Sequence, residues 1–231
     1  MVRETFERDL QHLQDEVLVL GSIVEKALGE AVEALKHRNL DEAQRIINGD
    51  REVNRKRFAI EAEVLTLIAT QQPMARDLRR LAAVLEIITE LERIGDYAKG
   101  ISKISIMIGE APLIKPLIDI PRMADKARDM LGRALGAFVR GDAELARAIP
   151  REDDEVDNLY NQVYRELMTY IMADPTTLEQ ANYLLWVAHN LERAADRVTN
   201  ICERTVFTAT GKMSELDTHF DEENDAAPAK I

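Results

Sequence analysis

The chain has 231 residues, of which 46% are hydrophobic and 31% charged, with only 10 glycines and 7 prolines. This length can bury the core of one large domain or two small ones, and the scarcity of helix breakers permits long helices. The formal net charge of −12 argues against nucleic acid or anionic lipid as the main partner, because both need a basic surface.

Three helices are predicted in the first unit, residues 1–108. Apolar residues spaced alternately three and four apart predict a helix over about 10–38. Asn39 is placed to cap a second helix over about 40–70. After a Gln-Gln-Pro break, a third helix is predicted over about 74–107.

A proline-containing linker at 109–121 separates this unit from a second one, residues 122–211. The second unit is also predicted to hold three helices, with a break in the middle one at Pro150. They cover about residues 122–140, 142–172 and 177–210. Residues 212–231 combine many acids with few apolar side chains, so we expect a disordered tail there.

The two units share sequence motifs as well as a helical pattern. Leu-Glu-Arg-x-x-Asp at 91–96 recurs at 191–196, and Asp-x-Glu-Val at 50–53 recurs at 153–156. The two spacings differ by a few residues that fall in an interhelical loop. The sequence therefore predicts an all-α protein of two tandem antiparallel three-helix bundles related by internal duplication.

Acidic side chains interrupt the apolar seams of these helices at matching positions. Glu92 and Glu192 each continue a line of leucines spaced seven residues apart, and Asp50 and Asp153 occupy equivalent seam positions in the middle helices. A carboxylate facing a bundle interior needs a cation, a hydrogen-bond donor or a proton. We therefore interpret these acids as parts of two candidate sites.

Distances counted from the hairpin loops bring four oxygen-bearing side chains to one height in each unit, because both helices rise equally per residue. The first set is Asp50, Asn54, Glu92 and Asp96, and the second is Asp153, Asp157, Glu192 and Asp196. Such sets suit divalent or trivalent ions such as Fe, Mn or Mg, and Zn stays possible although its usual Cys and His ligands are missing from these sets. Since Asn54 lowers the charge of the first set, the second is predicted to be the better metal site.

Structural explanations of the same residues remain open at this point. Arg93 and Arg193 could neutralise the acids as ordinary surface pairs, and Asp50 and Asp153 could be helix N-caps. The protein would then be a metal-free helical scaffold. Elemental analysis beside a Glu192→Ala/Asp196→Ala variant separates this alternative from a metal-binding protein.

An enzymatic alternative is a carboxylate-bridged di-metal centre in a helical bundle. Such centres use a Glu-x-x-His motif on two helices, but the residues three after Glu92 and Glu192 are Gly95 and Ala195. The four histidines, at 12, 37, 189 and 219, are scattered along the chain. We found no phosphate-binding loop, nucleophile elbow or catalytic triad in the sequence, and we expect a protein that is not an enzyme.

The cellular location is predicted from the same sequence. A single cysteine, Cys202, excludes an intrachain disulfide and fits a reducing compartment. No secretory signal is visible, and no uncharged apolar run reaches the ~18 residues of a membrane span. We expect a cytoplasmic protein that reaches the inner face of the membrane only through protein partners.

The duplicated Leu-Glu-Arg-x-x-Asp segments, the Asp-x-Glu-Val segments and Gln-Gln-Pro-Met-Ala-Arg-Asp-Leu-Arg at 71–79 resemble the PhoU family from about residue 3 to 210. The resemblance implies two three-helix bundles whose paired acidic motifs bind metal clusters. It also implies negative regulation of phosphate uptake and of the phosphate-starvation response. The partners it implies are the ATPase subunit of a phosphate ABC transporter, a membrane sensor histidine kinase and a second copy of the chain in a homodimer.

Overall fold

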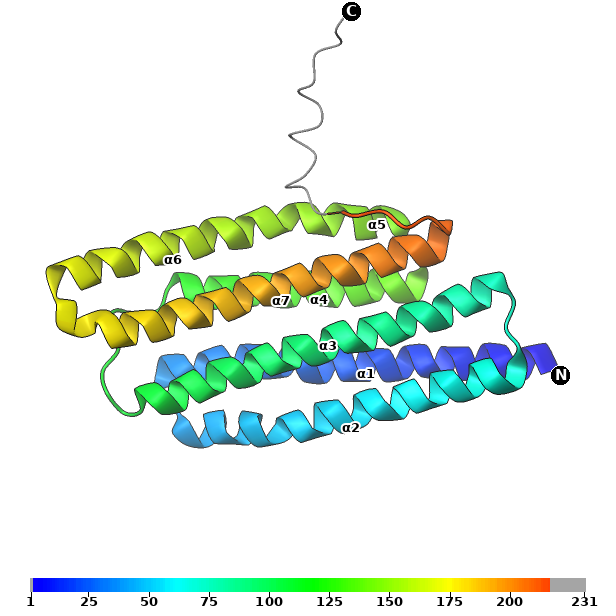
Figure 1. Ribbon diagram of the computed structural model, residues 1–231, viewed down its shortest axis with the longest axis horizontal. Helices are drawn as coiled ribbons and strands as arrows, with labels where there is room; N and C mark the ends of the chain where they lie inside the picture. Colours follow the sequence, from blue (N-terminus) through cyan, green and yellow to red (C-terminus); the bar gives the residue numbers. More distant parts are fainter. Residues whose placement is uncertain (1, 217–231) are drawn as a thin grey trace, which may run out of the picture.

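The computed structural model describes residues 2–216, and every regular element within that range is helical (Figure 1). The first unit consists of α1 (Val2–His37), α2 (Leu40–Gln71) and α3 (Ala75–Ile108). The second consists of α4 (Asp119–Arg140), α5 (Ala143–Ala148), η1 (Ile149–Glu152), α6 (Asp153–Ala173), η2 (Pro175–Thr177) and α7 (Leu178–Thr210). The predicted fold class, two tandem antiparallel three-helix bundles, is confirmed.

The helix ends follow from local chemistry. Asn39 caps α2 as predicted, because its side-chain oxygen accepts a hydrogen bond from the Glu42 N–H at 3.1 Å. Gln72 ends α2 in a left-handed conformation with φ of 46°. Helix α4 begins at Asp119, three residues before its predicted start. Pro121 does not prevent this, since the N–H groups of a first helical turn need no intrahelical partner.

The break predicted at Pro150 is present, where the 3-10 segment η1 joins α5 to α6. Glu152, at the end of η1, fastens this junction to α4. Its two carboxylate oxygens accept hydrogen bonds from Arg133 at 2.8 and 2.7 Å, and Lys126 lies 2.6 Å away. The Arg133 guanidinium is the main cause that lowers the pKa of Glu152 from 4.5 to about 2.

The two bundles lie side by side and share one continuous apolar core. Helix α3 packs against α7 and α1 packs against α4, whereas α2 and α6 lie on the outer sides (Figure 1). Fully buried leucines fill the centre of both halves, among them Leu13, Leu91 and Leu191. Each such side chain stabilises the fold by about 1.5–3 kcal/mol relative to an exposed one.

Beyond α7, residues 212–216 have no regular secondary structure. The Leu216 N–H donates a hydrogen bond of 2.9 Å to Glu203, and its side chain packs against the core. Residues 217–231, the greater part of the predicted tail, lie outside the described residues. Among the helices of residues 2–216, none is both long enough and apolar enough to cross a membrane.

Candidate metal-binding clusters

The first cluster lies where α2 faces α3, as the loop distances predict. Asp50 lies in the middle of α2 with its side chain only 8% exposed. Lys99 from α3 places its Nζ 2.7 Å from Asp50 Oδ2 and 3.4 Å from Asp96 Oδ1. The ammonium group of Lys99 therefore bridges an acid on α2 and an acid on α3.

The remaining members of this cluster adjust to that ammonium group. Asn54 turns its amide nitrogen toward Asp50, donating to the Asp50 backbone oxygen at 3.1 Å and to Oδ2 at 3.3 Å. Glu92 is half-buried. Its burial is the main cause that raises its pKa, and repulsion from Asp96 is the second cause. The first cluster thus contains a cation of its own, the Lys99 ammonium. Asn54 directs its amide N–H group to Asp50 and does not offer its oxygen as a ligand.

The second cluster lies where α6 faces α7. Burial raises the pKa of Glu192, and repulsion from Asp196 and Asp157 adds to that shift. His189 opposes the shift, since its Nδ1 lies 3.1 Å from Glu192 Oε2. Glu192 therefore lies near an acid of its own helix, Asp196, and an acid of α6, Asp157.

The counterpart of Lys99 in the repeat is Thr199. Thr199 is only 7% exposed, and within the described part of the chain its Oγ1 has no hydrogen-bond partner. Thr205, a buried hydroxyl further along the same helix, instead donates to the Ile201 carbonyl oxygen at 3.0 Å. Thr199 lines a cleft of about 420 Å³ together with Asp153, Asp196, Asn200 and Glu203. The repeat thus has a buried hydroxyl where the first half has Lys99, in a cleft that is lined mostly by oxygen-bearing side chains and also by Arg197.

Whether a metal fits differs between the two clusters. As the side chains stand in residues 2–216, no three Asp, Glu, His or Cys residues are grouped tightly enough to hold an ion. In the first cluster a metal would also have to displace Lys99 from Asp50. The second has donor groups that suit a hard cation, namely carboxylates and the unpaired hydroxyl of Thr199.

The structural explanations of the acids are partly wrong. Asp50 lies inside α2 and Asp153 is the first residue of α6, with Glu152 at the cap position, so neither is an N-cap. The closest acid to the Arg93 guanidinium is Glu90 at 3.8 Å, whereas Arg193 does lie 3.7 Å from Asp196. Sequence reasoning missed Lys99 and Thr199, although aligning the two repeats pairs them directly.

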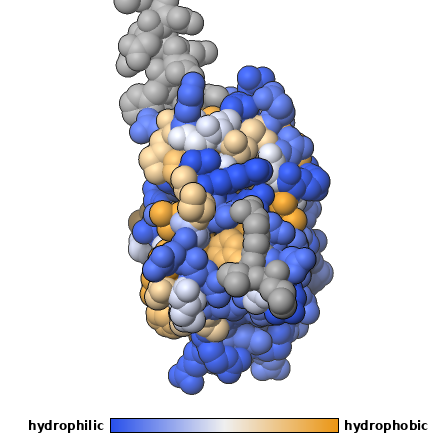
Figure 2. Space-filling model, turned by 90° about the vertical axis from the view of Figure 1, so that its right-hand side faces the viewer, coloured by the Kyte–Doolittle hydropathy of each residue, from blue (hydrophilic) through white to orange (hydrophobic). Residues whose placement is uncertain are grey.

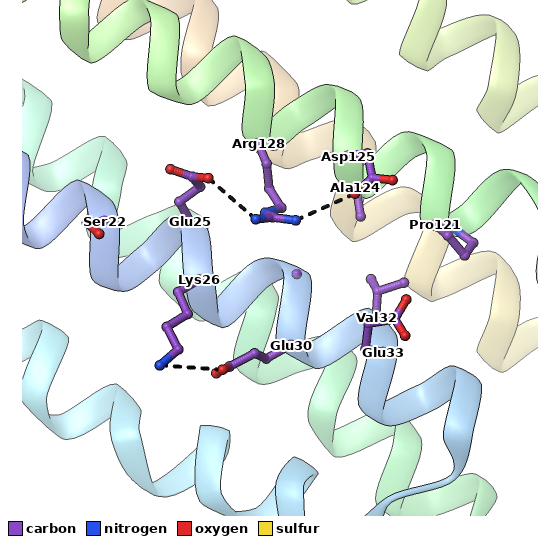
Figure 3. A pocket seen from close by; sticks show the side chains of 11 residues that line it. Ser22, Glu25, Lys26, Glu30, Val32, Glu33, Pro121, Ala124, Asp125 and Arg128 are labelled. Atoms are coloured by element: carbon purple, nitrogen blue, oxygen red, sulfur yellow. Dashed lines mark ion pairs between the residues drawn. The ribbon is translucent and has the colours of Figure 1, made fainter.

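Another cleft, of about 430 Å³, lies between α1 and α4 (Figure 3). Its charged groups are joined to one another: Arg128 Nη2 lies 3.5 Å from Glu25, Arg128 Nη1 lies 3.5 Å from Asp125, and Lys26 lies 3.6 Å from Glu30. Glu33 pairs with Lys36 and His37 outside the cleft. The pair between Arg128 and Glu25 joins the two bundles, the other two lie within one helix each, and every charged side chain that lines the cleft has a partner of opposite sign.

The fold and the clusters define a class of protein: a duplicated helical bundle with carboxylate clusters on two equivalent hairpins. A model of the PhoU domain matches residues 17–105 and 120–205. The chain belongs to the PhoU family.

Relatives resemble the chain over most of its length. The phosphate-specific transport system accessory protein PhoU homolog of Clostridium acetobutylicum is 37% identical over 221 residues, which cover 94% of this chain and 100% of the relative. The homolog of Aquifex aeolicus is 34% identical, covering 89% and 93%. The crystal structure of PhoU from Pseudomonas aeruginosa has a TM-score of 0.85 at 31% identity, covering 90% of this chain and 100% of that one. The phosphate transport system regulatory protein PhoU of Streptococcus pneumoniae has a TM-score of 0.84, also at 31% identity, covering 90% and 99%.

Proposed function

We propose that this protein is an accessory protein of phosphate-specific transport that restrains phosphate uptake and the phosphate-starvation response. The observation that carries the proposal is similarity to relatives of that name along nearly the whole chain, in both halves. The protein acts as a non-enzymatic adaptor in the cytoplasm. Its partners are the ATPase subunit of a phosphate ABC transporter, a membrane sensor histidine kinase and, in a homodimer, a second copy of itself.

The metal-binding part of the proposal is limited to the second cluster. Asp153, Asp157, Glu192 and Asp196 would hold a hard or borderline cation such as Fe, Mn or Mg, with Thr199 as a neutral oxygen beside them. Burial and then repulsion from neighbouring acids raise the pKa of Glu192, and a cation there would offset both effects and tie α6 to α7. The bound cation would balance the negative charge and make the outer face of the second bundle more rigid. A rigid surface of this kind suits the binding of a partner protein.

The regulatory role is tested in a strain that lacks the gene. The proposal predicts that alkaline phosphatase is made, and phosphate uptake is elevated, even in phosphate-rich medium, and that a plasmid copy of the gene restores repression. Full repression of the phosphatase together with normal uptake in the deletion strain would refute the regulatory role.

The absence of enzymatic activity is tested separately. Gly95 and Ala195 occupy the positions at which a di-metal oxidase of this type has histidine. We therefore expect the iron-loaded protein to consume no more oxygen than the same iron in buffer. Oxygen consumption that requires Glu192 would favour the enzymatic alternative.

A further inference from the structure

Four arginines gather at the end of the molecule where α3 begins and where α4 and α7 end. Arg76, Arg79 and Arg80 lie on the first turns of α3, and Arg140 is the last residue of α4. Among the described residues, none of these four side chains makes an ion pair or a hydrogen bond, and the Nε of Arg79 is buried without a partner. In a chain of net charge −12, such a group of unpaired cations is unexpected.

Three of these arginines line one pocket of about 180 Å³. Arg76, Arg80 and Arg140 surround it with Gln14 of α1 and Thr208 of α7, so four helices from both bundles contribute. None of the described residues that line it is acidic. Figure 2 faces this end of the molecule, where the surface is mostly hydrophilic with scattered apolar patches. The pocket is smaller than the about 300 Å³ at which sites for drug-sized ligands begin, so its size favours a small ion or one group of a larger ligand.

The arrangement of charge carries an energetic cost. Arg76 and Arg80 are four residues apart on α3, and like charges at that spacing destabilise a helix. They also lie at the N-terminus of α3, the positive end of the helix dipole, where the cap residue Met74 makes no side-chain hydrogen bond. In the cleft between α1 and α4 each cation has an acid beside it. Asp77 lies in the same first turn of α3, but among the described residues no carboxylate lies within ion-pair distance of Arg76, Arg79, Arg80 or Arg140.

The internal repeat shows that the fold does not require these arginines. At the equivalent positions the second repeat has Thr176 in η2 and Glu179 and Gln180 at the start of α7. Gln180 has a structural role, since its side-chain oxygen accepts from the Ile114 N–H and its nitrogen donates to the Pro112 oxygen at 3.0 Å. At the position of Arg80, the second repeat thus has a neutral side chain that ties down the linker, and it has no cation at the other two positions.

From these observations we propose that the pocket between Arg76, Arg80 and Arg140 binds a phosphoryl oxyanion. A guanidinium offers a planar fork of donors that pairs with two phosphate oxygens at once. The N-terminus of α3 adds a favourable dipole, and the Gln14 amide lies in the pocket lining as a neutral donor, whereas the Thr208 hydroxyl already donates to the Arg204 carbonyl oxygen at 2.6 Å. Because the pocket joins α1, α3, α4 and α7, a bound anion would brace the two bundles at this end. The ligand is either inorganic phosphate or the terminal phosphoryl group of a small phosphorylated molecule.

This inference does not rest on the proposed function, and its test measures binding alone. The full-length protein is first treated with a chelator, so that phosphate cannot bind through a metal in the second cluster. Isothermal titration calorimetry with inorganic phosphate, pyrophosphate and ATP as separate probes then identifies the source of the phosphoryl group. Sulfate titrated in parallel measures how far shape and charge alone suffice.

The variants are Arg76→Gln/Arg80→Gln on α3 and, independently, Arg140→Gln on α4. Arg165→Gln is the matched control, because Arg165 is an exposed arginine on α6 without a described partner. We expect saturable binding of at least one phosphoryl probe at one site per chain. The α3 double variant and the Arg140 variant should each weaken it at least about tenfold, the factor for loss of one charge-assisted hydrogen bond. The control should bind as the unmodified protein does.

Two results would overturn the proposal. One is that none of the three probes binds saturably to the folded, chelated protein. The other is that the α3 double variant and Arg140→Gln both bind as tightly as Arg165→Gln, which would place the anion elsewhere. Circular dichroism of each variant verifies folding, so a fold defect is distinguished from a lost ligand. A further variant, Arg80→Lys, keeps the positive charge while removing the planar pair of guanidinium donors.

Discussion

The two halves of this protein place the same motif on the same hairpin and balance its charge in different ways. In the first half, the ammonium of Lys99 lies between Asp50 and Asp96. In the second half, Thr199 takes that position, and Asp157 replaces Asn54. The two halves thus share three of the four acidic positions, and the second half has a neutral hydroxyl where the first has a cation. The comparison teaches that a repeated acidic motif does not by itself mean a repeated metal site.

The largest effect is expected from removing the internal cation. Lys99→Thr, which copies the second half, leaves the Asp50 carboxylate buried with neither oxygen neutralised. We expect unfolding free energy to fall by about 2 kcal/mol in chelated protein, less than for a fully buried pair because Lys99 is partly exposed. Urea denaturation measures this. The reciprocal variant, Thr199→Lys, should not destabilise comparably, and equal losses would contradict the asymmetry.

The next largest effect concerns the ion pairs of Glu152, which are found in the second half alone. Glu152 fastens the α5–α6 junction through Arg133 and Lys126, whereas α2 runs unbroken through the equivalent Gly49. Glu152→Gln should lower stability by about 1–2 kcal/mol at pH 7. Because the folded pKa is lowered from 4.5 to about 2, this contribution is present above pH 4.5 and is lost as the pH falls toward 2. A loss that stays constant down to pH 2 would contradict this account.

A smaller effect appears at high pH in the first half. The hydrogen bond to Asp50 is the main cause that raises the pKa of Lys99 above its ordinary 10.5. The stability from this pair is therefore complete below pH 10.5 and is lost as the pH rises through the higher folded value. The difference between the unmodified protein and Lys99→Thr should shrink above pH 10.5. Thermal unfolding across pH 8–12 tests this, and a difference that does not change over that range would argue against the pair.

The smallest effect concerns the close approach of the α2 and α3 backbones. Gly95 lets α2 come close to α3, since a Cβ there would lie 3.3 Å from Val53 Cγ1, whereas the second half has Ala195 at this position. Gly95→Ala gains helix propensity and presses on Val53, so we expect a net change within about 0.5 kcal/mol. Ala195→Gly should cost about 1 kcal/mol because Ala195 is fully buried and gains nothing in return. A loss above about 2 kcal/mol for Gly95→Ala would show that the first hairpin tolerates no Cβ.

Much of this architecture could be predicted from the sequence because helical periodicity and the duplicated motifs act locally. The cap at Asn39, the break at Pro150 and the convergence of Glu192 with Asp157 all follow from spacing along one or two helices. The end of the linker at residues 109–121 was harder to predict, since a proline can lie in a linker or in the first turn of a helix. Pro121 lies in the first turn of α4.

What spacing could not show is which neighbouring side chain reaches a site. Lys99 is one of several cations near Asp96 in the sequence, and only the packing of α3 on α2 brings its ammonium to Asp50. The arginine pocket likewise depends on helices from both bundles meeting at one end, with Arg140 far from Arg76 in the chain. Such convergence is a property of the tertiary fold.

The measurement that tests the central claim most directly is metal content by elemental analysis of proteins purified and reloaded in parallel. The asymmetry predicts that metal in the unmodified protein is lost in both Glu192→Ala/Asp196→Ala and Thr199→Lys. It predicts a higher metal content in Asn54→Asp/Lys99→Thr, because these two substitutions give the first cluster the residues of the second. Metal content that is unchanged in all three variants, or a loss that follows substitution of Asp50 and Asp96 instead, would contradict the claim that only the second cluster accepts a metal.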